Sequence, residues 1–187
     1  MRLVLASASP RRADLLRAAG FDFEVVAVDV DERARAGERP RDYVRRLAAE
    51  KSARGVETIA AQDGVVLGAD TTVVVDGEIL GKPGDDREAA AMLRRLSGRR
   101  HEVLTGVSVR RAGREVGRVE TTTVEFAPLT EADVAWYVAS GEGRDKAGAY
   151  AVQGLASRFI PRVEGSYSNV VGLPIAAVVE LLAEISA

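Results

Sequence analysis

Cysteine is absent from the 187 residues, and histidine occurs only once, at position 101. These absences exclude a thiol nucleophile, a disulfide framework, any zinc site that uses cysteine and any histidine-rich metal site. A serine–histidine–aspartate triad would depend on His101 alone. Arg100 and Glu102 flank it at the expected start of a strand, so we expect His101 to be a surface residue rather than a catalytic one.

A large excess of charge of one sign is also missing. The chain has 26 Lys and Arg against 28 Asp and Glu, a formal net charge of −2, so it lacks the basic character typical of proteins that bind nucleic acid or anionic membranes. No run approaches the roughly 20 apolar residues of a membrane span, and the start of the sequence has no signal-peptide pattern. With 47% hydrophobic and 29% charged residues, we expect a globular cytoplasmic protein that binds neither nucleic acid nor membrane.

Lysine is scarce, because only Lys51, Lys82 and Lys146 accompany the many arginines. A lysine is a compact, strongly hydrated point charge, whereas arginine is a planar fork. Positions that have kept lysine in such a chain are therefore candidates for a function that needs this geometry, with chance as the alternative. We favour function for Lys51 and Lys82 and leave Lys146 open.

Hydrophobic periodicity predicts alternating strands and helices. Strands are expected at residues 3–6, 21–28 and 65–75, and a hairpin of long strands within 101–127 that turns around residues 112–113. Helices are expected at 10–20, at 40–54, from 85 or 86 to 96, from 130 onward and at 175–185, the last mostly buried. Trp136 and Tyr137 are expected to fill a core or an interface.

The segment from Ser7 to Arg12 predicts a turn at the start of a helix. Ser9 is a suitable N-cap and Pro10 suits the first helical position. The segment thus places two hydroxyls, two guanidiniums and free backbone N–H groups together, a combination that binds phosphate readily. The alternative is an ordinary capped helix with solvated arginines.

Two charged residues interrupt apolar patterns. Asp70 lies within the valine-rich strand expected at 65–75, where a carboxylate is costly to bury unless it is paired or binds a metal. Asp70 is therefore the strongest single functional candidate. Lys51 falls on the helix face formed by Val44, Leu47 and Ala48, so it either extends outward to solvent or points into a polar cleft.

Three carboxylates lie close together in the sequence at Asp29, Asp31 and Glu32. Clustered carboxylates suit Mg²⁺ or Mn²⁺. A solvated loop is the commoner explanation for such a cluster when it is taken alone.

Five ordered motifs together resemble the Maf family of nucleoside triphosphate pyrophosphatases over almost the whole chain. They are Ser7-Ala8-Ser9-Pro10-Arg11-Arg12, Gly68-Ala69-Asp70-Thr71, Gly81-Lys82-Pro83, Lys146-Ala147-Gly148-Ala149-Tyr150 with Gln153-Gly154, and Gly165-Ser166-Tyr167 with Gly172-Leu173-Pro174. The resemblance implies an α/β fold similar to inosine triphosphate pyrophosphatases, with a mixed sheet, flanking helices and two lobes around a central cleft. One such domain would span residues 1–187, form a homodimer and require a divalent cation, Mg²⁺ or Mn²⁺.

The resemblance also implies roles for individual residues. Asp70 matches the catalytic proton acceptor, and Asp70 with Glu32 matches the metal site. The positions associated with base specificity are Arg11, Thr71 and Gln153. The positions matched to phosphate binding are Ser7, Arg12, Lys51 and Lys82.

The reaction implied is attack of water on the α-phosphorus of a nucleoside triphosphate, with release of pyrophosphate. The loop motifs are similar to the branch that acts on dTTP and UTP, and modified uridine triphosphates are further candidate substrates. The Gln153 amide can donate and accept at once, which matches the O4 and N3–H edge of uracil or thymine. The alternative from another functional class is a non-catalytic, nucleotide-binding regulator of septum formation. A purely structural α/β domain would leave Asp70 and Lys51 unexplained.

Overall fold

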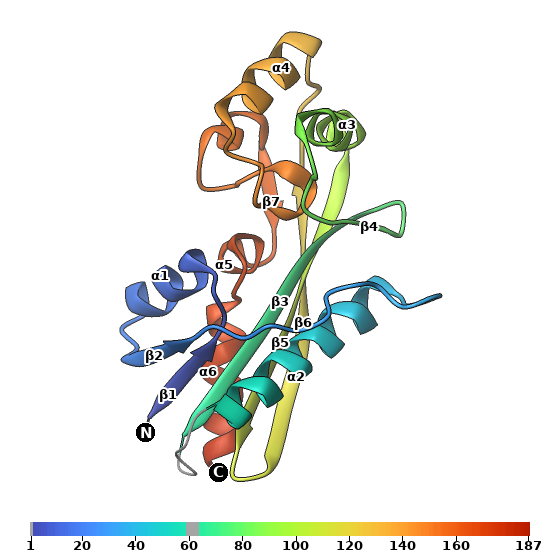
Figure 1. The fold of residues 1–187 in the computed structure, drawn as a ribbon. Coiled ribbons are helices and arrows are strands. Elements are labelled where there is room, and N and C mark those ends of the chain that lie inside the picture. The colour runs from blue at the N-terminus through green and yellow to red at the C-terminus, as the bar shows by residue number, and fades with distance from the viewer. Residues whose placement is uncertain (1, 59–63) are drawn as a thin grey trace. The chain divides into compact units, whose positions relative to one another are not determined.

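The computed structural model describes residues 2–58 and 64–187, and its course is drawn in Figure 1. The helices are α1 (Pro10–Ala18), α2 (Pro40–Thr58), α3 (Asp86–Leu96), α4 (Glu131–Ser140), α5 (Tyr167–Val171) and α6 (Ile175–Ser186), with 3₁₀ turns η1 (Ala147–Ala149) and η2 (Leu155–Phe159). The strands are β1 (Leu3–Ala6), β2 (Phe23–Val26), β3 (Val65–Val75), β4 (Glu78–Leu80), β5 (Arg100–Arg111), β6 (Arg114–Glu125) and β7 (Arg162–Glu164). Within these ranges no helix combines the length and apolar character needed to cross a membrane.

The strands form a mixed sheet in the order β2-β1-β3-β5-β6-β7, with β4 paired to β3. Strand β1 pairs in parallel with both β2 and β3, whereas β4 and β7 pair antiparallel with β3 and β6. The α/β class with a mixed sheet and flanking helices is therefore confirmed. The hairpin turn between β5 and β6 is also confirmed, because Ala112 and Gly113 both have positive φ, as such a turn requires.

The expected elements are present with differences at their ends, whereas β4, β7, α5 and the 3₁₀ turns were not expected from the sequence. Strand β2 is shorter than the expected 21–28, and α2 continues four residues beyond Arg54. Ser9 occupies the N-cap position of α1, with Pro10 after it, but its side chain makes no capping hydrogen bond. Ser9 therefore has the position of an N-cap, but its side chain does not cap the backbone N–H groups of α1. By contrast, Thr130 and Asp133 form the complete capping box at the start of α4.

The chain divides into two compact units. The first comprises residues 1–71, 105–120 and 172–187, and the second comprises residues 72–104 and 121–171. Strands β3, β5 and β6 each contribute residues to both units.

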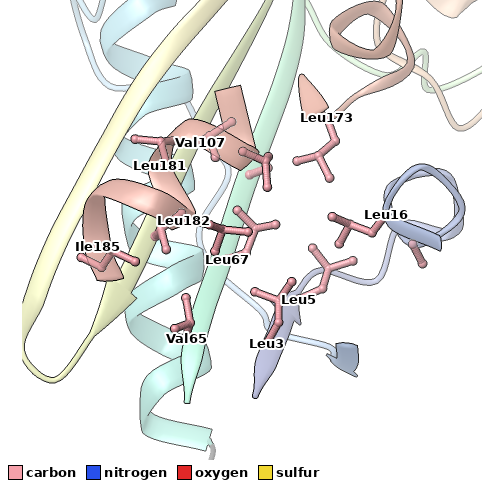
Figure 2. Packing of buried hydrophobic residues seen from close by; sticks show 14 residues of the cluster. Leu3, Leu5, Leu16, Val65, Leu67, Val107, Leu173, Leu181, Leu182 and Ile185 are labelled. Atoms are coloured by element: carbon pink, nitrogen blue, oxygen red, sulfur yellow. The ribbon is translucent and has the colours of Figure 1, made fainter. Parts of the chain in front are cut away.

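In the first unit the two faces of β3 have different partners, because successive side chains in a strand point to opposite faces. Val65, Leu67 and Ala69 join the main apolar cluster with residues of α1 and α6. Figure 2 shows Leu67 together with Leu181 and Leu182 of α6 in this cluster. The alternate residues Val66, Gly68 and Asp70 belong to the opposite face, where Gly68 lies directly against α2. The same alternation therefore directs Asp70 toward that helix.

Glycine allows α2 to approach the sheet closely. A Cβ atom at Gly68 would lie 2.4 Å from the carbonyl oxygen of Ala48, and one at Gly106 on β5 would lie 2.1 Å from that of Val44. Both neighbours are backbone atoms of α2, which cannot move aside as a flexible side chain can. These two glycines therefore set the separation between the helix and the sheet.

In the second unit α3 and α4 pack against each other. Tyr137 on α4 is 1% exposed and fills the core, as expected. Trp136 is 42% exposed, and the guanidinium of Arg158 lies 4.5 Å from its ring centroid. Of the two expected locations, a core or an interface, Tyr137 therefore occupies the core, whereas Trp136 lies outside it and its place in an interface stays a prediction.

The surface assignment of His101 is wrong. The side chain is 3% exposed, and its Nε2 lies 2.8 Å from the hydroxyl of Tyr150. Strand alternation explains the error, because His101 and Val103 share the buried face while Glu102 faces outward. Its ring packs edge-on against Phe126 and Tyr150. Burial lowers the pKa of His101 to about 4, so the neutral ring is a core group rather than a catalytic base.

We predict that Gly106→Ala lowers the free energy of unfolding by about 1–3 kcal/mol, because the new methyl group overlaps the α2 backbone. Urea unfolding measures the change. Gly81→Ala is the matched control, because its Cβ would have no neighbour within 4 Å and its φ is not positive. Equal stability of the two variants would contradict the close-approach argument.

A second prediction concerns acid stability. Unfolded histidine titrates near pH 6.5 and folded His101 near pH 4, so between these values the unfolded chain binds more protons. His101 therefore makes stability fall as pH drops through this window, by up to about 1.4 kcal/mol per pH unit. His101→Gln should remove this component, so that unfolding curves from pH 7.5 to 4 show a shallower decline. Parallel declines in the two proteins would show that His101 is not buried in its neutral form.

Candidate active site

Lys51, Asp70 and Glu32 form one ion-paired cluster in the first unit. The Lys51 ammonium donates to Asp70 Oδ1 at 2.7 Å and to Glu32 Oε1 at 2.6 Å. Lys51 is 8% exposed and Asp70 is 7% exposed, whereas the Glu32 side chain is half exposed. Of the two alternatives for Lys51, the structure supports the one in which it points into a polar site.

The electrostatics of Asp70 reflect opposing effects. Burial raises the pKa of its carboxyl above the ordinary value, and the positive charges of Lys51 and Arg12 oppose that rise. The carboxylate thus combines two properties of a general base, since it is partly desolvated and it is held in a fixed direction by an ion pair. The cost of burying Asp70 is offset by Lys51, as the sequence pattern requires.

Arg12 organises a second cluster in the same unit. Its Nε donates to the carbonyl of Gly172 at 2.8 Å, and its two terminal nitrogens donate to Ser7 Oγ and Thr71 Oγ1, both at 3.2 Å. Burial lowers the pKa of the guanidinium, while the negative charge of Asp70 acts in the opposite direction. Arg12 stays charged because even a lowered arginine pKa is far above neutrality. The structure therefore brings a fixed cation, Ser7 and Thr71 together near Asp70.

The hydroxyl of Thr71 is fully used by protein partners. Its oxygen accepts from Arg12 and lies 2.9 Å from Thr105 Oγ1 and 3.2 Å from the carbonyl of Gly172. A hydroxyl has one donor and two lone pairs, which these contacts occupy. Thr71 therefore orients Arg12 directly. Arg11, its predicted companion in base specificity, is half-buried beside Arg12.

Helix α2 also holds the segment that carries Glu32. The Tyr43 hydroxyl donates to the carbonyl of Glu32 at 2.9 Å, and burial, aided by Asp70 and Glu32, raises the pKa of Tyr43 to about 12. Arg46 binds Glu38 at 2.6 Å and lowers its pKa to about 2, so this pair remains ionised. The sequence pattern did not single out these residues, because Tyr43 and Arg46 bind partners on the segment between β2 and α2, which has no periodicity.

An open pocket of about 400 Å³ lies over the same segment. Its lining is formed by Asp31, Arg33, Ala34, Arg35, Arg46 and Glu50. The charged groups pair with one another, as in Arg33 with Asp31 and Arg35 with Glu50. We therefore interpret these pairs as supports of the Glu32 segment.

The remaining predicted residues belong to the second unit. Lys82 follows β4 and is exposed, and Gln153 is exposed in the turn before η2. Lys146, left open from the sequence, donates to the carbonyl of Glu142 and to Asp145 Oδ1, both at 2.6 Å. Lys146 therefore has a structural role in its own loop.

Asp70 and Glu32 carry carboxylate oxygens, which are the type of ligand that Mg²⁺ or Mn²⁺ prefers. Among residues 2–58 and 64–187, no group of three or more histidine, aspartate or glutamate side chains is arranged to hold a metal ion. Mg²⁺ commonly binds one or two carboxylates and takes its other ligands from water and substrate phosphates. Two carboxylates directed at one ammonium thus fit such an ion chemically.

We predict that Lys51→Met destabilises the protein by about 3 kcal/mol at pH 8, because it leaves the buried Asp70 carboxylate without its partner. The loss should be smaller at pH 5 than at pH 8, because burial raises the pKa of the Asp70 carboxyl and so favours its protonated form when the pH falls. Urea unfolding without added metal measures both values. The double variant Lys51→Met/Asp70→Asn is the control and should recover most of the stability at pH 8. A loss independent of pH and of Asp70 would contradict the ion-pair interpretation.

Comparison with known proteins gives a consistent family assignment. The family described as Maf-like protein matches residues 2–185. A dTTP/UTP pyrophosphatase of Anaeromyxobacter dehalogenans (strain 2CP-C) is 54% identical over 185 residues, which cover 97% of this chain and 92% of the relative. One from Symbiobacterium thermophilum is 51% identical over 183 residues, covering 98% and 93%. Among solved structures, the Staphylococcus aureus Ham1 protein gives a TM-score of 0.49 at 15% identity, covering 100% of this chain and 98% of that one. The family match over residues 2–185 and the identity of 51–54% to the two pyrophosphatases show that the chain belongs to the Maf family.

Proposed function

We propose that this protein hydrolyses the bond between the α- and β-phosphates of nucleoside triphosphates, with dTTP and UTP as preferred substrates. The products are a nucleoside monophosphate and pyrophosphate. Relatives at about half identity bear the name dTTP/UTP pyrophosphatase. The observation that carries the proposal is the buried Asp70 carboxylate, held by Lys51 at 2.7 Å in the same unit as the Arg12 cluster. This arrangement places a carboxylate that can act as a base in the same unit as the positively charged groups of Lys51 and Arg12.

Asp70 acts as the base in this proposal. It accepts a proton from water while the water oxygen forms a bond to the α-phosphorus. The bond from the α-phosphorus to the bridging oxygen breaks, and pyrophosphate leaves with that electron pair. Lys51 keeps the carboxylate directed, and the raised pKa of Asp70 makes it a better proton acceptor than a solvated aspartate.

The cations bind the triphosphate. Arg12 is already oriented by Ser7, Thr71 and Gly172, so little conformational entropy is lost when it meets a phosphate. Lys51 and the exposed Lys82 contribute further positive charge. Stabilising the charge on the leaving group is the main electrostatic task in phosphoryl transfer.

Base selection is assigned to Gln153, with Arg11 and Thr71. An amide that both donates and accepts suits the O4 and N3–H edge of uracil and thymine, and mismatches cytosine at position 4. Thr71 contributes through Arg12, because its hydroxyl is saturated by protein partners. Removal of modified uridine triphosphates from the nucleotide pool is a role consistent with this selectivity.

A divalent cation, Mg²⁺ or Mn²⁺, is part of the proposal, with Asp70 and Glu32 as its protein ligands. When bound, it would neutralise triphosphate charge and lower the pKa of a bound water. A homodimer, a cytoplasmic location and a single domain over residues 1–187 are likewise proposed from the family resemblance.

The test is release of pyrophosphate from a panel of canonical and modified nucleoside triphosphates, with Mg²⁺ or Mn²⁺. We predict release from dTTP and UTP, and a loss of at least about 10³-fold in Asp70→Asn because the base is removed. Equilibrium binding of the same nucleotides is measured in parallel. Binding without hydrolysis by the unaltered protein would instead support a nucleotide-binding regulator.

A further inference from the structure

The turn that carries Gln153 is attached at both ends to two side chains of the second unit. The backbone N–H of Ala151 donates to the Tyr137 hydroxyl at 3.0 Å. Beyond Gln153, the backbone N–H groups of Leu155 and Ala156 donate to the Glu142 carboxylate at 2.9 and 3.4 Å. The exposed Gln153 thus lies between two parts of the backbone that are hydrogen-bonded to these side chains.

Tyr137 and Glu142 are themselves joined. The phenol donates to Glu142 Oε2 at 2.7 Å, so a continuous chain of hydrogen bonds runs from Ala151 to Ala156. Tyr137 is buried in the core of its unit, which fixes its position. Burial and the bond to Glu142 raise the pKa of Tyr137, so the phenol remains a donor. The Glu142 backbone is fixed in turn by Lys146.

Gly154 fits this arrangement because it has no side chain. A Cβ atom there would lie 1.9 Å from Glu142 Oε1. The carboxylate therefore fills the space that any other residue at position 154 would need. The residue next to Gln153 is thus in direct contact with the group that holds the turn.

We infer that Tyr137 and Glu142 are positioning residues that fix the Gln153 amide and thereby set the base selectivity of the enzyme. This inference rests on the proposed function, in which Gln153 reads the base. An amide can discriminate between uracil and cytosine only when its donor and acceptor are held in one orientation. The hydrogen-bonded pair holds the backbone on both sides of Gln153 and so limits the positions from which its amide can reach the base.

The test variant is Tyr137→Phe, which removes the bond to Glu142 and the acceptor of Ala151 N–H. We predict that the UTP-over-CTP ratio of kcat/KM falls about tenfold, while kcat with CTP is unchanged. Tyr150→Phe is the matched control, because it also removes one buried hydroxyl in the same unit but contacts His101 instead. It should lose comparable stability and keep the ratio. Glu142→Gln replaces one carboxylate oxygen, which accepts hydrogen bonds, with an NH₂ group, which donates them. This variant should also lower the UTP-over-CTP ratio of kcat/KM.

Combining the change with Gln153→Ala identifies the route of the effect. If Tyr137 acts through Gln153, the double variant has the same ratio as Gln153→Ala alone. A further fall in the double variant, or an unchanged ratio in Tyr137→Phe, would overturn the inference. An unchanged ratio in Gln153→Ala would overturn both the inference and the proposed base site, but not the hydrolysis.

Amide hydrogen exchange tests the restraint independently of activity. Exchange at residues 151–156 should be faster in Tyr137→Phe than in Tyr150→Phe. Equal exchange in the two variants would overturn the inference even if the protein hydrolyses UTP. If the unaltered protein hydrolyses no nucleotide, the proposed function fails and the selectivity role falls with it, while faster exchange would still identify the restraint.

Discussion

The ammonium group of Lys51 connects the parts of the first unit on which the proposed chemistry depends. It binds a carboxylate on β3 and another on the segment after β2, while its own backbone belongs to α2. A buried carboxylate requires its counter-ion at hydrogen-bond distance, so the separation of α2 from the sheet is tightly limited. Gly68 and Gly106 meet that limit by leaving space for the helix backbone.

The alternation of β3 then distributes the polar groups over two faces. Asp70 shares the α2 face with Gly68, and Thr71, the next residue, points to the other face and meets Arg12 of α1. One strand thus presents the Asp70 carboxylate, which is the base of the proposed mechanism, and the hydroxyl that orients Arg12 from adjacent residues. The Arg12 guanidinium lies close enough to Asp70 for the two charges to influence each other.

The sequence predicted those features that depend on a local hydrophobic pattern, or on a charged residue that interrupts such a pattern. Asp70 and Lys51 stood out because a charge within an apolar pattern needs a partner, and the structure shows that each is the other's partner. The bond from Arg12 to Gly172 joins residues 160 positions apart, and no spacing rule reveals it. His101 was misassigned because its charged neighbours dominated the pattern, although strand alternation turns them away from it. Tyr137 was correctly expected in a core, but its hydroxyl partners follow from the tertiary structure alone.

The contact between Gly154 and Glu142 has a consequence for how this sequence can change. A side chain at position 154 would overlap the carboxylate at 142, so a larger residue there must displace that carboxylate from its hydrogen bonds or be accompanied by a shorter residue at 142. Shortening residue 142 first, however, removes the acceptor of two backbone N–H groups and leaves an intermediate with a loosened turn. The two positions are therefore expected to vary together among relatives. A route that remodels the turn one substitution at a time passes through a less stable form. A simultaneous change at both positions avoids that form.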